Sequence, residues 1–172
     1  MSRKPVDPNI AQIVLALPNA EATARAGALL APLMRPTDVL ALWGDLGAGK
    51  TSLARALIQT CLAKTGQVED VPSPTFTLVQ TYETADLPIW HADLYRLKDP
   101  DELIELGLDE ALETGLLVLE WPDRMGADLP VARLDIELTE QGEGRVAKLT
   151  GPARLWEERL GCVLRQWTVS QV

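Results

Sequence analysis

An eight-residue run from Gly44 to Thr51 constrains this chain more than any other feature. It has the sequence Gly-Asp-Leu-Gly-Ala-Gly-Lys-Thr, which fits the pattern Gly-x-x-x-x-Gly-Lys-Thr. A short apolar segment, residues 38–43, precedes it, and a segment with helical periodicity, residues 50–63, follows it. A glycine-rich turn between a strand and a helix directs backbone N–H groups at a ligand from the helix N-terminus. The run therefore predicts a phosphate-binding loop at the edge of a sheet.

The residue types in this run suit a polyphosphate bound with a metal ion. Glycines at 44, 47 and 49 allow the backbone to wrap around phosphate oxygens, but their spacing does not fit the dinucleotide pattern Gly-x-Gly-x-x-Gly. Lys50 adds a positive charge between the β- and γ-phosphates, and the Thr51 hydroxyl suits Mg²⁺. We expect an Mg²⁺-dependent ATPase whose nucleotide contacts include Gly44, Asp45, Leu46, Gly47, Ala48, Gly49, Lys50, Thr51 and Ser52.

Two carboxylates directly follow apolar runs and are candidates for the Mg²⁺ site. Asp93 ends one predicted strand and Glu120 ends another, and the carboxyl ends of parallel strands are where ligands bind in α/β folds. The sequence does not decide which of the two contacts the metal. Thr75 follows Pro74 in a stiff loop and is predicted to sense the γ-phosphate. His91, inside a strand, is interpreted as a hydrogen-bonded structural residue and not as a base.

The alternation of strands and helices predicts an α/β three-layer fold of the P-loop NTPase type, with parallel central strands flanked by antiparallel hairpins. Residues 1–172 are expected to form one domain, with a flexible tail over residues 1–9. Apolar patterns predict strands at 10–17, 38–43, 76–82, 87–95, 116–119, 133–140 and 145–149. They also predict helices after Asn19 and at 50–63, 100–113 and 152–168. In the last helix, Trp156, Leu160, Val163, Leu164 and Trp167 are expected to share a buried face.

Composition narrows the class of function. The net charge of −9 disfavours direct binding to RNA or DNA, because phosphate backbones are bound by basic patches. No apolar run is long enough to span a membrane, and no secretion signal is visible, so we expect a cytoplasmic protein. Cys61 and Cys162 have no metal-binding or redox spacing and are interpreted as buried thiols.

Four motifs together resemble the bacterial TsaE (YjeE-type) ATPases. They are the Gly44–Thr51 loop, Ser73-Pro74-Thr75-Phe76, His91-Ala92-Asp93-Leu94-Tyr95-Arg96-Leu97 and Leu119-Glu120-Trp121-Pro122-Asp123, and the resemblance covers about residues 10–140. The family usually has an aromatic residue where this chain has Ala92. The resemblance implies ATP hydrolysis that supports formation of N6-threonylcarbamoyladenosine at position 37 of tRNAs that read codons beginning with A. It also implies a TsaB–TsaD partner complex, with tRNA contacted only indirectly.

The resemblance also implies roles for particular residues. Lys50 would contact the phosphates, Thr51 and Glu120 would lie at the Mg²⁺ ion, and Asp93 and Thr75 would be needed for hydrolysis. Residues outside the loop are implied in contact with the rest of the nucleotide: Trp121 by packing, and Thr23 and Arg133 on the adenine side.

Two other functions share the phosphate-binding loop. A small-molecule kinase usually carries an arginine-rich lid, whereas the arginines Arg96, Arg124 and Arg133 are scattered in this sequence. A nucleotide-gated binding module would use hydrolysis only to reset a partner complex. A GTPase is disfavoured because no Asn-Lys-x-Asp segment is present. An acidic stretch is expected to be a solvated helix face or to steer a basic partner: Asp99, Asp101, Glu102, Glu105, Asp109, Glu110 and Glu113.

Overall fold

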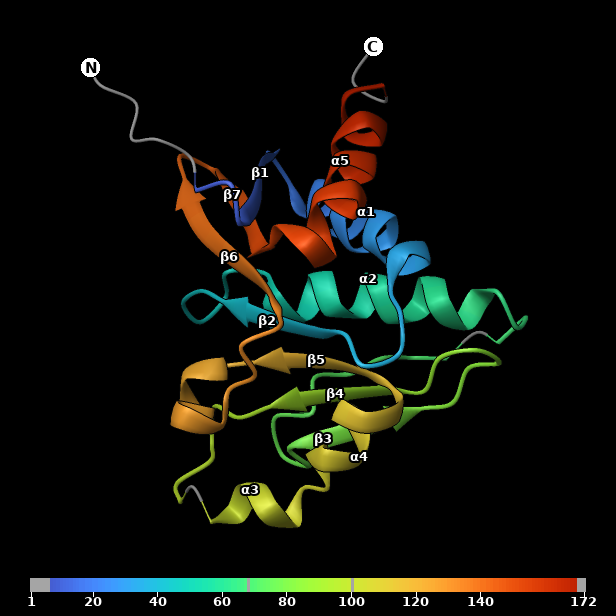
Figure 1. Ribbon diagram of the computed structural model, residues 1–172, viewed down its shortest axis with the longest axis vertical. Coiled ribbons are helices and arrows are strands. Elements are labelled where there is room, and N and C mark those ends of the chain that lie inside the picture. The colour runs from blue at the N-terminus through green and yellow to red at the C-terminus, as the bar shows by residue number, and fades with distance from the viewer. Residues whose placement is uncertain (1–6, 68, 100, 170–172) are drawn as a thin grey trace.

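A single seven-stranded sheet organises the chain (Figure 1). The computed structural model describes residues 7–67, 69–99 and 101–169, and the strand order is β1-β7-β6-β2-β5-β4-β3. Its parallel centre is β6 (Leu134–Gln141), β2 (Val39–Trp43), β5 (Leu116–Glu120) and β4 (Ile89–Asp93). Antiparallel strands flank this centre: β3 (Val79–Tyr82) beside β4, and β7 (Gly144–Pro152) and β1 (Ile10–Leu17) beyond β6. The expectation of parallel strands flanked by antiparallel ones is confirmed.

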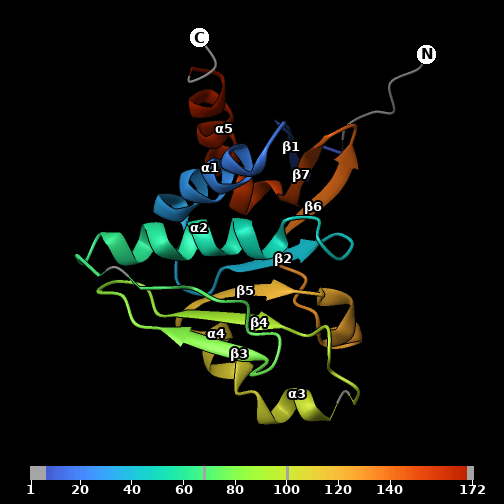
Figure 2. The same cartoon turned by 180° about the vertical axis from the view of Figure 1, so that it is seen from behind.

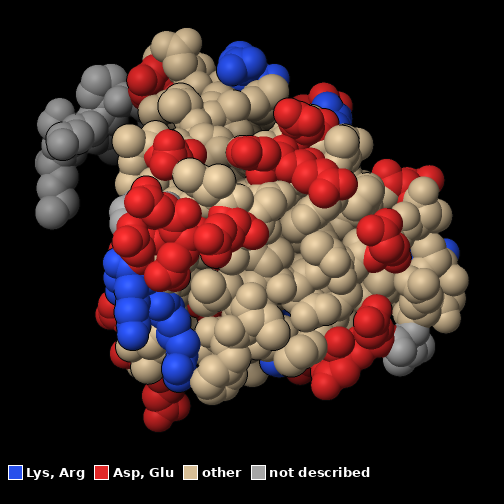
Figure 3. All heavy atoms as spheres, turned by 90° about the horizontal axis from the view of Figure 1, so that it is seen from below, with Lys and Arg blue, Asp and Glu red and all other residues tan. Residues whose placement is uncertain are grey.

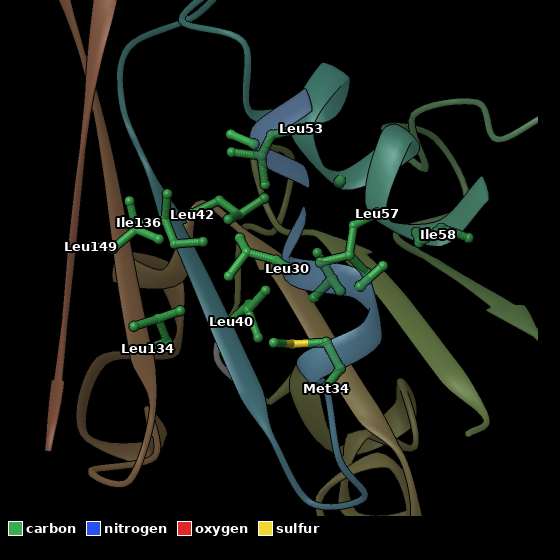
Figure 4. Packing of buried hydrophobic residues seen from close by; sticks show 14 of the residues in the cluster. Leu30, Met34, Leu40, Leu42, Leu53, Leu57, Ile58, Leu134, Ile136 and Leu149 are labelled. Carbon is green, nitrogen blue, oxygen red and sulfur yellow. The ribbon is translucent and has the colours of Figure 1, made fainter. Parts of the chain in front are cut away.

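Helices cover both faces of the parallel centre, because its strands are apolar on both sides (Figures 1 and 2). Leu40 and Leu42 of β2 face one hydrophobic cluster with α1 (Ala20–Leu30), η1 (Ala31–Leu33), α2 (Lys50–Ala63) and α5 (Ala153–Val169). Figure 4 shows the part of this cluster between β2 and the helices α1 and α2. Val39, one residue away on the strand, belongs to the opposite cluster. That cluster includes side chains of α3 (Glu102–Glu105), α4 (Leu108–Thr114) and η2 (Pro122–Asp128).

A helix cap, a close helix crossing and an ion pair hold α1 and α5 in place. The Asn19 side chain caps α1 by accepting a hydrogen bond from the backbone N–H of Ala22. Gly27 allows α1 to cross α2 closely, because a Cβ there would overlap the carbonyl oxygen of Leu53. The buried Arg159 of α5 forms an ion pair with Asp38, just before β2. The last helix is therefore tied to the central strand.

Two expected elements differ from the structure. Residues 76–78 form a turn and not the start of β3. Leu78 has a positive φ of 66° and its N–H bonds the carbonyl oxygen of Pro74, which leaves Phe76 80% exposed. The acidic segment forms two short helices, α3 and α4, because Gly107 between them is left-handed, with φ of 67°. Pro100, its expected start, lies outside the described residues.

The buried face of α5 also differs in one member. Trp156, Leu160, Val163 and Trp167 are buried as expected, but Leu164 is 39% exposed. Residues 1–6 of the expected tail lie outside the described residues. Cys61 is buried, and burial raises the pKa of its thiol, whereas Cys162 is only half-buried; both are free thiols. Among the described helices, none is long and apolar enough to cross a membrane.

Candidate functional site

The glycine-rich run forms the loop between β2 and α2, at the carboxyl edge of the parallel strands. Gly44, Gly47 and Gly49 all have positive φ angles, 146°, 79° and 105°. At Gly44 a Cβ would also lie 2.7 Å from the carbonyl oxygen of Leu138, so no larger residue fits there. Gly49 is the N-cap residue of α2, so no side chain there occupies the N–H groups of the first turn. The first N–H groups of α2 are thus directed at the space above the loop.

Lys50 is held at this loop, although it is buried. Its ammonium group donates hydrogen bonds to the carbonyl oxygens of Gly44 and Asp45, and it lies 4.2 Å from the centre of the Trp121 ring. Burial lowers the pKa of Lys50, and nearby carboxylates, Glu120 first among them, oppose that shift. The pKa of Lys50 is lowered overall, because the cost of burial exceeds the effect of these carboxylates.

Two buried carboxylates end neighbouring strands beside Lys50. Asp93 of β4 and Glu120 of β5 are paired in the sheet register, so both emerge at the carboxyl edge. The Thr51 hydroxyl lies 3.0 and 2.9 Å from the two carboxylate oxygens of Glu120. His91 Nε2 lies 2.8 Å from Glu120 Oε1. Helix α2 and strand β5 thus bring a hydroxyl and a carboxylate together where the sequence predicts them.

Asp93 has a different set of partners. Its Oδ2 atom accepts hydrogen bonds from Ser73 Oγ at 3.2 Å and Thr75 Oγ1 at 3.3 Å, and its Oδ1 accepts one from the N–H of Tyr95. The two hydroxyls are also 2.7 Å apart. The prolines beside Ser73 and Thr75 restrict the backbone of this loop. The carbonyl oxygen of Leu78 accepts a hydrogen bond from the N–H of Asp93, which anchors the loop to β4.

These groups line one cleft of about 420 Å³. Its walls also include Ser73, Tyr95 and Arg96, which sequence reasoning did not single out. Trp121 forms one wall in a left-handed conformation, with φ of 58°, and its ring centre is 4.9 Å from that of Tyr95. Ser73, Tyr95 and Arg96 all belong to the motifs of the resemblance, which was the available signal. The predicted site residues in the cleft are Leu46, Gly47, Ala48, Gly49, Lys50, Thr51, Ser52, Thr75, Asp93, Glu120 and Trp121.

A second cavity of about 200 Å³ lies across the loop from this cleft. Thr23 of α1 lines it together with Gly47, Gly49 and Ser52. Arg145, at the start of β7, lines it too and donates a hydrogen bond to the carbonyl oxygen of Gly47. Sequence reasoning missed Arg145, because only the β6–β7 pairing brings it to the loop.

Arg133 is not brought to either cavity. It precedes β6 at the amino edge of the parallel strands, opposite the loop, and its guanidinium pairs with Asp135. The structure therefore does not support its expected place on the adenine side. Gly44 and Asp45 line a further pocket, beside the loop.

The donor atoms in the cleft fit a hard cation. Within the described ranges no group of three or more His, Cys, Asp or Glu residues is arranged to hold a metal. The neighbouring oxygens of Thr51, Glu120 and Asp93 form instead an open set of few protein ligands, which suits Mg²⁺ bound together with phosphate oxygens and water.

Comparisons with known proteins show the family of this chain. A family model described as "Threonylcarbamoyl adenosine biosynthesis protein TsaE" matches residues 17–147, which include the loop, both carboxylates and Arg145. The chain belongs to the TsaE family. The TsaE protein of Rickettsia felis is 40% identical over 132 residues, covering 76% of this chain and 75% of that protein. Bacillus subtilis TsaE is 38% identical over 126 residues, covering 73% and 76%.

A solved TsaE-like structure extends the likeness to most of the fold. The crystal structure of Bacillus subtilis YdiB is similar with a TM-score of 0.75 at 30% sequence identity, covering 91% of this chain and 97% of that one. The family match ends at residue 147, within β7. Helix α5 thus lies outside the part of the chain that identifies it as TsaE.

Proposed function

We propose that this TsaE-family protein binds ATP with Mg²⁺ in the cleft above the glycine-rich loop and hydrolyses it. One observation carries the proposal: Lys50, Thr51, Glu120 and Asp93 meet in a single cleft, although they come from α2, β5 and β4. The type of fold proposed is a P-loop NTPase, in which binding uses loop amides, a lysine and a hydroxyl at the start of the helix.

Phosphate binding follows from the groups at the loop. The N–H groups at the start of α2 and the Lys50 ammonium would bind the β- and γ-phosphates, and Lys50 would exchange its bonds to loop carbonyls for phosphate oxygens. Thr51 and Glu120 would hold Mg²⁺, which neutralises charge that develops on the phosphates. Asp93 remains a second carboxylate near the same ion.

Hydrolysis requires a group that orients and deprotonates water. Asp93 is suited to this work because it ends a strand at the cleft and hydrogen bonds from two hydroxyls hold its carboxylate in place. Thr75 shares Asp93 with Ser73, so a γ-phosphate that draws Thr75 away would change the loop 73–78. That coupling supports Thr75 as a sensor of the bound nucleotide.

The adenosine part would occupy the cavity between α1 and the start of β7. Thr23 and Arg145 line it on the side of the loop away from Glu120, and a guanidinium over a base supplies stacking and charge. In this proposal Arg145 takes the place that the family resemblance implied for Arg133. Trp121 stays on the phosphate side, beside Lys50.

The family membership and the site together support a role in formation of threonylcarbamoyladenosine on tRNA, with a TsaB–TsaD complex as partner. Direct contact with tRNA has little support. The chain carries a net charge of −9, and Figure 3 shows acidic side chains spread widely over one face. A partner complex would therefore supply the surface that binds tRNA.

The test is ATP hydrolysis by the purified chain with and without TsaB–TsaD, for wild type, Lys50→Ala and Lys64→Ala. Lys64 is an exposed lysine just after the same helix and serves as the matched control. We expect slow turnover alone, faster turnover with the partner, and loss of turnover only in Lys50→Ala. No nucleotide binding under any condition would overturn the proposal.

The same experiment separates the other readings of the site. Vigorous hydrolysis by the isolated chain would contradict the nucleotide-gated binding module. Binding without partner stimulation would favour a small-molecule kinase, but the arginines give this reading little support: Arg96 lines the cleft, whereas Arg124 pairs with Asp123 and Arg133 with Asp135.

A further inference from the structure

The only histidine of the chain, His91, is buried beside the carboxylate of Glu120. His91 is on β4, opposite Val118 of β5, two residues before Glu120. Because side chains alternate along a strand, His91 and Glu120 project from the same face of the sheet. His91 is 0% exposed and Glu120 is 2% exposed. A buried polar pair of this kind is costly unless its hydrogen bonds are made.

The hydrogen-bond partners decide which ring nitrogen carries the proton. His91 Nε2 is 2.8 Å from Glu120 Oε1, whereas buried Nδ1 has no partner among the residues that the structure describes. A proton on Nδ1 would leave a buried N–H donor unpaired and would set two acceptors against each other at Nε2. A proton on Nε2 makes the bond to Glu120 and leaves only a lone pair unpaired, which is the smaller cost.

We propose that His91 is a positioning residue that fixes the Glu120 carboxylate toward the cleft through its Nε2–H group. The inference rests on the proposed function, in which Glu120 and Thr51 hold Mg²⁺. Among the described residues, the Glu120 carboxylate accepts its other hydrogen bond from the Thr51 hydroxyl, the group assigned to the same ion. His91 therefore supplies the contact that does not depend on the metal, as partners behind metal ligands commonly do.

The first test uses the wild-type protein without a histidine tag. Because the chain has one histidine, long-range ¹H–¹⁵N NMR of the imidazole reports its tautomer without ambiguity. We expect a protonated Nε2 and an unprotonated Nδ1. A neutral ring with its single proton on Nδ1 would overturn the inference, because Nε2 could then not donate to Glu120.

The second test compares two amide variants that differ by one methylene group. The Gln side chain in His91→Gln can place an N–H near the position of Nε2, whereas His91→Asn is too short to reach Glu120. The measurement is the ratio of dissociation constants for a non-hydrolysable ATP analogue without and with Mg²⁺, with thermal melting as the check on folding. We expect His91→Asn to reduce this ratio about tenfold and His91→Gln to keep it close to wild type.

Each outcome bears on one proposal or the other. Equal loss in both variants, or an unchanged ratio in His91→Asn, would overturn the positioning role. Equal weakening of metal-free binding would also overturn it, because His91 would then support the fold. The proposed function fails separately, if wild-type binding does not respond to Mg²⁺ or if Lys50→Ala binds the analogue as tightly as wild type.

Discussion

Asp93 and Glu120 show how two carboxylates at paired positions of neighbouring strands acquire different chemical surroundings. Glu120 is bonded to Thr51 on the phosphate loop, whereas Asp93 is bonded to two hydroxyls of the 73–75 loop. The sequence left open which of them contacts the metal. In the proposed site, the contact with Thr51 favours Glu120 as the closer metal ligand. Asp93 is then free to orient and deprotonate the attacking water.

Replacing Asp93 by Asn tests that division of roles. The amide keeps the size of the side chain but cannot take a proton, so we expect Asp93→Asn to lower the rate of ATP hydrolysis about 100-fold. The dissociation constant for ATP should change little. Ser73→Ala, which removes one hydrogen bond to Asp93, is the milder control. Single-turnover hydrolysis and equilibrium binding measure the two effects, and an Asp93→Asn protein with the wild-type rate would contradict the assignment.

Tyr82 of β3 carries a buried hydroxyl that has no hydrogen-bond partner within the described part of the chain. Tyr82→Phe removes this unpaired group, so we expect the free energy of unfolding to rise by about 1 kcal/mol. Urea denaturation at pH 7 measures it. A decrease would indicate that the hydroxyl is satisfied by water.

At high pH the free energy of unfolding should fall more in wild type than in Tyr82→Phe. Burial raises the pKa of Tyr82 above its ordinary value of 10.0, and Glu69 and Asp70 add to the shift. The folded state therefore keeps the phenol proton longer than the unfolded state does, and wild-type stability falls as pH rises from about 10 through the folded-state pKa. Tyr82→Phe has no phenol to ionise, so its free energy of unfolding should not show this decrease. Cys61 contributes equally to both proteins, so their difference isolates Tyr82.

The predicted site residues that the structure brings together are those with a local sequence signal. Lys50 and Thr51 follow from one contiguous run, and Glu120 and Asp93 each follow an apolar strand; the structure brings all four into one cleft. Arg145 could not be predicted in this way, because its place depends on the pairing of Arg145 with Glu140 across a hairpin.

At the scale of elements, strands were easier to predict than the breaks between them. The central strands lie where apolar runs predict them, within a residue or two. The apolar pattern continues through Leu106 and Leu108, so it gave no warning of the left-handed Gly107 that divides α3 from α4. The alternation at residues 76–82 likewise hid the turn at Leu78, which depends on a tertiary contact with β4.

Two glycines in helices make a matched pair for testing helix packing. Gly27→Ala should lower the free energy of unfolding by about 2 kcal/mol, because its Cβ would overlap the backbone of α2 at Leu53. Gly161→Ala on α5 meets only the flexible Arg165 side chain, at 3.3 Å. There the higher helix propensity of alanine should raise stability by up to about 1 kcal/mol. Urea denaturation of both variants checks this, and similar changes in the two would contradict the close crossing.

At the scale of the whole molecule, ligand binding should be visible as stability. A ligand that binds only the folded state, at 100 times its dissociation constant, adds about 2.7 kcal/mol. For a chain of this size we expect Mg²⁺ and ATP to raise the melting temperature by roughly 5–10 °C. Lys50→Ala should show little of this rise. Differential scanning calorimetry measures it, and an equal rise in both proteins would mean that ATP binds elsewhere.

The class of fold could be predicted at this scale, but the strand order could not. Local patterns indicate a parallel centre with hairpins, because apolar runs and helices alternate. These patterns do not show that β7 lies between β1 and β6, because β1 could also pair with the other edge of the sheet. In the structure, side chains of β1 and β7 pack in one hydrophobic cluster with those of α1 and α5.

The pairing of β1 with β7 has a consequence for synthesis of the protein. Residues 10–17 leave the ribosome before the phosphate loop and both carboxylate strands, whereas their partner, residues 145–152, emerges after all of them. Strand β1 must therefore wait with its backbone groups unpaired while the nascent chain grows. Until β7 arrives, the apolar side chains and unpaired backbone of this strand favour aggregation unless a chaperone or the helix that follows covers them.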